Sequence, residues 1–399
     1  MKYLIVLGDG MADEPLEELG GKTPLECAKT PMMDELSLVS EIGLAKTIPE
    51  GLKPGSDVAN LAVLGYNPEV YYSGRSPLEA LSIGVDMKDT DIAMRVNLVT
   101  VSDDDKKYED KTMIDHSSGE ISTEDAAVLL DAVREALETD EYKFYLGTSY
   151  RHLCIWDKGE VLEFSQPHDI LGQAIEKHLP NNEIFLNMMK KSYEILNNHP
   201  INVERAKKGL NKANSIWFWG AGVKPKLDSF EEKTKLKGVM ISAVDLLKGI
   251  AVGAGMTNID VEGANGTLET NYEGKAYAAI KALTEDEYDF AYIHVEAPDE
   301  MGHQGSIERK IKAIENLDQK VIKPLVTGLG KRGIEYRMLI MPDHPTPIRL
   351  RTHTSEPVPY MIYDVTNKVL SGLKYTEAEA SKSDNYVEKG YTTIDRLVN

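Results

Sequence analysis

Short apolar runs of strand-forming residues recur along this chain, and several end directly in residues that carry chemistry. The first run, residues 3–7, is followed at once by Gly-Asp-Gly at 8–10. Buried parallel strands have this composition, and the functional residues of open α/β sheets follow the carboxyl ends of such strands. We therefore expect buried parallel strands at residues 3–7, 215–219, 238–242, 290–294, 338–341 and 359–363.

Segments with helical periodicity separate these runs. Examples are residues 243–252, 274–283 and 307–327. Strands that alternate with helices of this length are typical of βαβ units. The alternation predicts an α/β fold with a three-layer core around a mostly parallel sheet.

The order of strand-like and helical runs changes in the segment 89–179. Strand-like runs are expected at 94–101, 142–146 and 152–156, and helices at 122–137 and near 170–178. Ser122 or Thr123 is placed to cap the first of these helices. We expect a smaller α+β domain here, inserted into a core formed by 1–88 and 180–399. A substrate-binding lid and a purely structural insertion fit the pattern equally well.

The composition narrows the function classes. The 399 residues are enough for two domains, and their formal net charge of −20 argues against binding to nucleic acid or to an anionic membrane surface. Only two cysteines occur, without metal-site spacing, so a reducing cytoplasm fits best. The chain has no apolar run of about 20 residues, and its first residues do not resemble a signal peptide. The sequence does not determine the oligomeric state.

Seven residues at predicted strand ends and turns are able to hold metal ions. Asp299 and His303 are four residues apart after a predicted strand, so a helical turn opened by Pro298 would point both side chains the same way. Mixed oxygen and imidazole ligands favour manganese, zinc or cobalt over magnesium. The complete set is Asp9, Ser56, Asp299, His303, Asp343, His344 and His353.

Simpler roles exist for some of these residues. An aspartate between glycines, as at Asp9, often caps a turn. Ser56 precedes an apolar helical run and suits an N-cap. The same position also suits catalysis, because a helix N-terminus attracts phosphate groups.

The segments that carry these residues resemble the alkaline phosphatase superfamily, and within it the cofactor-independent phosphoglycerate mutases of the short, archaeal-type branch. The resemblance spans nearly the whole chain, through GDGMAD, GSDVANL, SGRSPLEA, DHSSG, APDEMGH, MPDH and RTHT. It implies an alkaline-phosphatase-like core and a reaction that interconverts 3-phosphoglycerate and 2-phosphoglycerate. It also implies that Ser56 is the nucleophile and becomes phosphorylated during the reaction.

Further site residues follow from this resemblance. It implies two divalent metal ions, with manganese expected first, one held by Asp9, Ser56, Asp343 and His344 and the other by Asp299, His303 and His353. Basic residues would hold the carboxylate and phosphate of the substrate, and His116 is favoured because the family keeps a histidine in a similar motif. The candidates are His116, Arg95, Arg151, Lys224 and Arg75. His152 and His168 fit simple packing.

One residue departs from the mutase pattern. Position 296 is Glu, where some short-branch mutases carry a basic residue, and a related subgroup has been proposed to act as a homoserine kinase. Three alternatives to the mutase therefore stay open: a homoserine kinase-like phosphotransferase, a metal-dependent phosphomonoesterase and an inactive metal-binding scaffold. No phosphate-cradling nucleotide loop is visible, and an inactive scaffold has little reason to keep Ser56.

Overall fold

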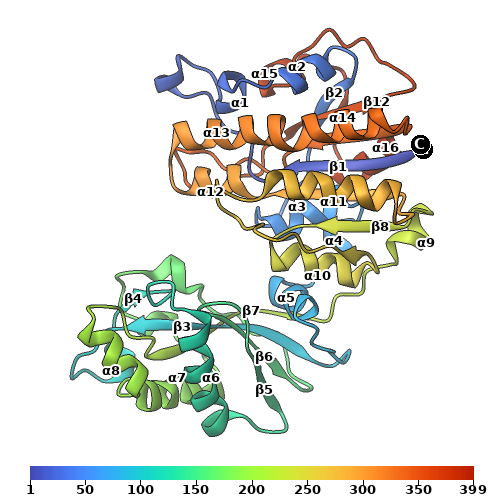
Figure 1. The fold of residues 1–399 in the computed structure, drawn as a ribbon. Coiled ribbons are helices and arrows are strands. Elements are labelled where there is room, and N and C mark those ends of the chain that lie inside the picture. Colours follow the sequence, from blue (N-terminus) through green and yellow to red (C-terminus); the bar gives the residue numbers. More distant parts are fainter. The chain divides into compact units, whose positions relative to one another are not determined.

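The computed structural model describes all 399 residues and divides them into two compact units. The first unit comprises Met1–Tyr72 and Lys226–Asn399, and the second comprises Ser73–Pro225 (Figure 1). The segment predicted as an insertion, 89–179, lies inside the second unit. That unit extends beyond the predicted segment at both ends.

An eight-stranded sheet forms the centre of the first unit. Its strands, in spatial order, are β13 (Tyr386–Val387), β2 (Glu41–Ala45), β12 (Val358–Asp364), β11 (Tyr336–Met341), β1 (Lys2–Gly8), β10 (Phe290–Val295), β8 (Gly238–Ile241) and β9 (Thr257–Asn258). Only β12 runs against the others. The expectation of a parallel strand at 359–363 was wrong, because no crossover helix lies between β11 and β12.

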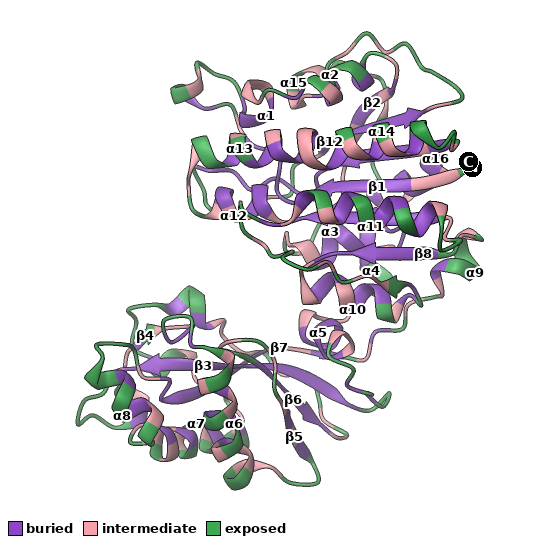
Figure 2. Cartoon of the chain, viewed as in Figure 1, coloured by how far each residue is buried: buried purple, intermediate pink, exposed green.

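Helices cover both faces of this sheet. Leu4 and Val6 of β1 point into a core shared with α11, α13 and α14, which lie across one face in Figure 1. On the opposite face, Tyr292 of β10 donates a hydrogen bond to Asn60 of α3. The central strands are buried along most of their length, as Figure 2 shows in purple. The predicted three-layer α/β core is therefore confirmed.

The helices of the first unit follow the expected segments closely. The stretch predicted at 307–327 is one helical run to Lys331, with a π-helical turn at Asp318–Ile322. No helix has the combination of length and apolarity that crossing a membrane needs. The helices are α1 (Pro24–Cys27), α2 (Pro31–Ser37), α3 (Ser56–Val63), α4 (Pro68–Tyr71), α9 (Phe230–Thr234), α10 (Asp245–Gly253), α11 (Tyr272–Thr284), α12 (Ala297–His303), α13 (Ile307–Leu317), α14 (Lys323–Lys331), α15 (Glu377–Ala380) and α16 (Thr393–Val398).

The second unit is built on an antiparallel sheet around one long, fully buried strand, β3. Its elements are α5 (Arg75–Ser82), β3 (Ile92–Val101), β4 (Met113–Asp115), α6 (Thr123–Leu137), β5 (Tyr142–Tyr145), β6 (Arg151–Trp156), α7 (Glu183–Leu196), α8 (Pro200–Lys207) and β7 (Ser215–Val223). Ser122 caps α6 as expected, by accepting the N–H of Asp125.

Two expectations for the second unit were wrong. The run at 215–219 is part of β7, which pairs antiparallel with β3 instead of joining the parallel sheet, because β3 is buried along its whole length and needs a neighbour on each side. The helix expected near 170–178 is absent. Gly172 has a positive φ of 76°, which interrupts a right-handed helix, and only short 3-10 turns remain, at Pro167–Ile170 and Glu176–His178.

A buried ion pair joins α13 to the loops that leave β1 and β11. Lys310 of α13 has no exposed surface and donates hydrogen bonds to Asp13 Oδ2 at 2.7 Å, to the Thr346 carbonyl at 2.8 Å and to the Ala12 carbonyl at 3.2 Å. Asp13 also accepts the main-chain N–H of Ile348. This one lysine therefore fixes two loops against each other.

We predict that Lys310→Met destabilises the protein by about 3–5 kcal/mol, because it leaves the buried Asp13 carboxylate without its cation. Urea unfolding monitored by circular dichroism measures the effect. The matched control is Lys312→Met on the same helix, where an exposed lysine pairs with Glu315 and the loss should stay below about 1 kcal/mol. Equal losses in the two variants would contradict the role of the buried pair.

Candidate active site

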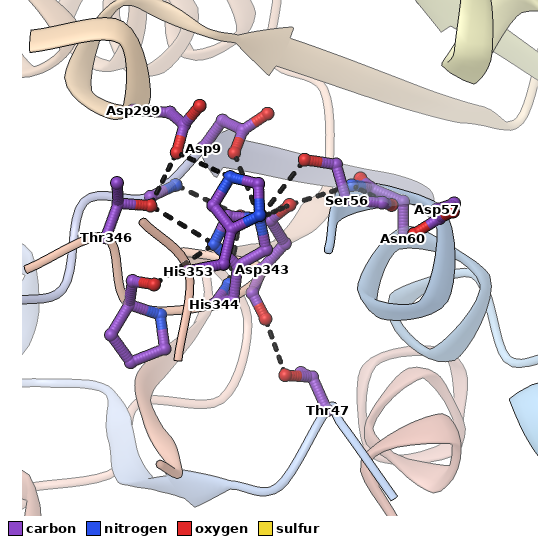
Figure 3. A network of polar contacts seen from close by, with 12 residues as sticks. Asp9, Thr47, Ser56, Asp57, Asn60, Asp299, Asp343, His344, Thr346 and His353 are labelled. Atoms are coloured by element: carbon purple, nitrogen blue, oxygen red, sulfur yellow. Dashed lines mark hydrogen bonds and ion pairs between the residues drawn. The ribbon is translucent and has the colours of Figure 1, made fainter. Parts of the chain in front are cut away.

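The register of three neighbouring strands gathers reactive side chains at one edge of the sheet. Leu7 of β1 lies beside His294 of β10 and Met341 of β11, so the chain positions that follow these strands meet at the same edge. Asp9 and Asp343 come from these positions, and the start of α3 supplies Ser56. Figure 3 shows these side chains converging. The structure brings all seven predicted ligands together within the first unit.

The first group surrounds the ring of His344. Its Nε2 atom lies 3.1 Å from Ser56 Oγ, 3.3 Å from Asp343 Oδ2 and 3.6 Å from Asp9 Oδ1. Ser56 is the first residue of α3, whereas Gly55 is its N-cap. The Ser56 hydroxyl therefore does not cap the helix, and it faces the ligand group.

The second group consists of Asp299, His303 and His353. Both histidines approach Asp299, with His303 Nε2 at 3.2 Å from Oδ2 and His353 Nε2 at 3.4 Å from Oδ1. The two Nε2 atoms are 3.0 Å apart. Asp299 and His303 share one turn of α12 that begins with Ala297 and Pro298, as their spacing predicts. The rings of His344 and His353 are 4.1 Å apart, so the two groups adjoin.

The first group has the electrostatics of a cation site. Burial raises the pKa of Asp9 well above its usual range, and the nearby carboxylates of Asp343, Asp299 and Glu296 raise it further. Asp9 Oδ1 is buried and has no hydrogen-bond partner. A bound cation would neutralise these carboxylates and give that oxygen a partner, so the residues present fit a divalent metal ion.

In the second group, paired charges dominate. Burial by itself would raise the pKa of Asp299, but hydrogen bonds and charges from His303 and His353 hold it well below its usual range. Burial would lower the pKa of His303, yet its hydrogen bond to Asp299 and the charge there raise it to about 9. Without a metal, His303 therefore carries a proton at neutral pH, and a metal ion has to displace it.

Three residues without a predicted role hold the ligands in place. His294 lies between Asp9 Oδ2, at 2.8 Å, and Ser242 Oγ, at 3.1 Å. Asn60 donates to Asp343 Oδ2, and Thr346 donates to Asp299 Oδ1. The sequence alone contains a signal for Asn60, because four residues separate it from Ser56 and place both on one face of a helix. The contacts of His294 and Thr346 arise only from the tertiary structure.

Gly10 is required by the crowding at this edge. Its φ is +58°, and a Cβ atom there would lie 2.4 Å from Thr346 Oγ1 and 2.5 Å from Asp299 Oδ1. The glycine also lets its own N–H reach Asp343 Oδ1, at 3.1 Å. The Gly-Asp-Gly motif is therefore a close-approach turn as well as a source of a ligand.

All five predicted substrate-binding residues lie in the second unit, and all of them except Lys224 gather in one basic cluster. Arg75 and Arg95 both donate to Glu79. Burial, and next the charges of Arg75 and Arg151, lower the pKa of Arg95, against the raising effect of Glu79. Burial and the nearby His116 likewise lower the pKa of His168.

Aromatic rings connect this basic cluster. Tyr150 lies under the guanidinium of Arg151 and 5.7 Å from the ring of His116. His168 packs between the rings of His116 and Trp219, at the edge of this cluster.

Two other basic residues of this unit do not share these contacts. Lys224 donates to the Met87 carbonyl and lies 3.9 Å from Asp86. His152 is packed as expected, and burial lowers its pKa to about 3.

Comparison with known proteins points to one family. The model of the 2,3-bisphosphoglycerate-independent phosphoglycerate mutase family matches residues 39–202. A mutase of this type from Methanosarcina barkeri is 49% identical over 405 residues, covering 100% of this chain and 99% of its own. A probable one from Geobacter sulfurreducens is 48% identical over 403 residues, covering 100% of both chains.

Solved structures show the same fold over the whole chain. The PH0037 protein from Pyrococcus horikoshii has a TM-score of 0.81 and 30% identity, covering 99% of this chain and 96% of its own. The cofactor-independent phosphoglycerate mutase from Thermoplasma acidophilum has a TM-score of 0.64 and 27% identity, covering 100% of this chain and 99% of its own.

The raised pKa of His303 predicts that divalent metal binding at the second group tightens as the pH rises. Below pH 9 a metal ion must release the proton of His303, so affinity should increase about tenfold per pH unit between pH 6 and 8. Titration calorimetry with Mn²⁺ in buffers of different ionisation enthalpy measures both the affinity and the proton released. A flat affinity without proton release would rule out His303 as a ligand.

Proposed function

Because the chain belongs to the family of 2,3-bisphosphoglycerate-independent phosphoglycerate mutases, we propose that it interconverts 3-phosphoglycerate and 2-phosphoglycerate through a phosphoserine at Ser56. It is thus an isomerase that acts on a small phosphorylated substrate. The observation that carries the proposed mechanism is the position of the Ser56 hydroxyl, 3.1 Å from His344 Nε2 in a group of buried carboxylates. The two relatives of highest stated identity are named as mutases, which favours this activity over the kinase-like and phosphatase alternatives.

Ser56 is well placed for attack on a phosphoryl group. As the first residue of α3 it lies where main-chain N–H groups and the helix dipole favour a negatively charged phosphate. Asn60, one turn further along α3, donates to the Ser56 carbonyl at 2.8 Å and to Asp343 Oδ2 at 2.9 Å. The proposed nucleophile Ser56 and Asn60, which holds the ligand Asp343, therefore lie on the same helix.

Seven side chains would hold two divalent cations. Asp9, Ser56, Asp343 and His344 would bind one ion, and Asp299, His303 and His353 the other, with manganese expected from the mixture of carboxylates and imidazoles. Two such ions supply ionisation of the serine hydroxyl and neutralisation of the charge on the transferred phosphoryl group. His344 is buried and its ring lies against that of His353, so it would help to hold the ligands of both ions in position.

The basic cluster of the second unit would bind the negatively charged groups of the substrate. Arg151 is exposed and stacks on Tyr150, so its guanidinium is available to a carboxylate or a phosphate. Two of the nitrogen atoms of Arg95 are already bonded to Glu79, which leaves it a smaller part in ligand binding. His116 and Arg75 complete the proposed set, with Lys224 at a separate position.

We also propose a cytoplasmic location. Both cysteines, Cys27 and Cys154, are free thiols, and Cys154 is buried. Free buried thiols fit a reducing compartment. No nucleic acid or membrane partner is proposed for this acidic chain.

We predict that Ser56→Ala abolishes mutase turnover and phosphoenzyme formation while most of the metal binding remains, because only one of seven ligand side chains is lost. The assay couples 3-phosphoglycerate to enolase without added 2,3-bisphosphoglycerate or ATP, and detects phosphoenolpyruvate. Mass spectrometry checks for phosphoserine. The matched control is Ser229→Ala, since Ser229 is an N-cap serine whose loss should cost about 1 kcal/mol of stability and no activity. Turnover by Ser56→Ala would remove the nucleophile assignment.

We predict that Arg151→Met raises the KM for 3-phosphoglycerate about 10–100-fold, the effect of losing one charged hydrogen bond. Metal content and Mn²⁺ affinity should not change, because Arg151 is not one of the seven proposed metal ligands. The control is Lys191→Met on α7, which removes an exposed positive charge from the same unit. An unchanged KM, or an equal rise in the control, would argue against specific substrate contact by Arg151.

A further inference from the structure

Thr346 follows the metal-ligand pair Asp343–His344 by two residues and is completely buried. Its main-chain N–H donates to the Ala12 carbonyl at 3.2 Å, and its own carbonyl accepts a hydrogen bond from Lys310 at 2.8 Å. The main chain on both sides of the side chain is therefore fixed. The Thr346 hydroxyl contacts Asp299 and His344, as the dashed lines in Figure 3 show.

The contacts of this hydroxyl reach one ligand of each group. Thr346 Oγ1 lies 2.5 Å from Asp299 Oδ1 and 3.3 Å from His344 Nδ1. The carboxylate of Asp299 accepts hydrogen bonds, so the single hydroxyl proton is donated to it. Only lone pairs of Oγ1 then remain for His344.

This direction determines which nitrogen of His344 carries the proton. An oxygen that offers only lone pairs needs an N–H on Nδ1. The Pro345 carbonyl, also 3.3 Å from Nδ1, can only accept and leads to the same result. The proton is therefore on Nδ1, and the bare Nε2 atom faces Ser56, Asp343 and Asp9, as a metal ligand requires.

We propose that Thr346 is a positioning residue that joins the two metal-ligand groups, because its hydroxyl orients Asp299 in one group and fixes the tautomer of His344 in the other. The inference rests on the proposed metal-binding role of these groups. A chain of hydrogen bonds from His344 through Thr346 to Asp299 also links the groups energetically, since each bond polarises the next. An ion bound at Nε2 of His344 strengthens the donor at Nδ1, and thereby strengthens the bond to Asp299.

The test compares Thr346→Val with Thr346→Ser by titration calorimetry of metal-free protein with Mn²⁺. Valine keeps the shape of threonine but removes the hydroxyl, and we expect both binding steps to weaken, by about 10–100-fold for the ion at Asp299. Serine keeps the hydroxyl and should restore affinity to within a few-fold of wild type. The matched control is Thr354→Val in the same loop, because the Thr354 hydroxyl is buried without a partner and its removal should leave both binding steps unchanged.

Urea unfolding of the metal-free variants establishes that each one folds. Wild-type affinity at both steps in Thr346→Val overturns the proposal, and so does a serine variant that binds as weakly as the valine variant. A loss confined to one step shows that the hydroxyl does not join the groups and overturns it as well. A wild-type protein that binds no Mn²⁺ contradicts the proposed metal sites themselves, and this outcome is distinct from the other three.

Discussion

Repulsion among buried carboxylates is the constraint on which the rest of this structure depends. Asp9, Asp299 and Asp343 lie almost without solvent in one small region at the end of the central strands. Like charges in such surroundings are costly unless cations or hydrogen-bond donors compensate them. The donors found here are main-chain N–H groups of Gly10 and His344 and the side chains of His294, Asn60 and Thr346, with His303 and His353 also acting on Asp299. The negative charge that these donors leave uncompensated favours the binding of cations.

The residues that hold the ligands in place come from elements that surround them. β10 supplies His294, α3 supplies Asn60, and α13 supplies Lys310, which clamps the loops after β1 and β11. Each of these residues is buried and fixed by packing, so the ligands they hold have little freedom. A site built this way is preorganised for charge before any ion or substrate arrives. The cost is a set of buried polar contacts that tolerate few substitutions.

The chain carries a net charge of −20 and yet belongs to a family whose members act on a phosphorylated acid. Long-range attraction therefore cannot bring the substrate in, and local positive charge has to bind it. In the second unit we propose that Arg75, Arg95 and Arg151 supply that charge, with Glu79 holding two of them in place. In the first unit the proposed metal ions would supply it.

The sequence by itself determined the features that depend on local spacing and chemistry. The four-residue separation of Asp299 and His303 required only one helical turn to become a pair of neighbouring ligands, and the strand-end position of Asp9 required only a buried parallel strand. The capping of α6 by Ser122 likewise depends only on residues close to it in the sequence. The tertiary structure alone decided that β7 joins β3, that β12 runs antiparallel, and that Thr346 and His294 contact the ligands. An apolar run looks the same in either sheet and in either direction, and a contact between residues far apart in sequence exists only once the sheet register has placed them side by side.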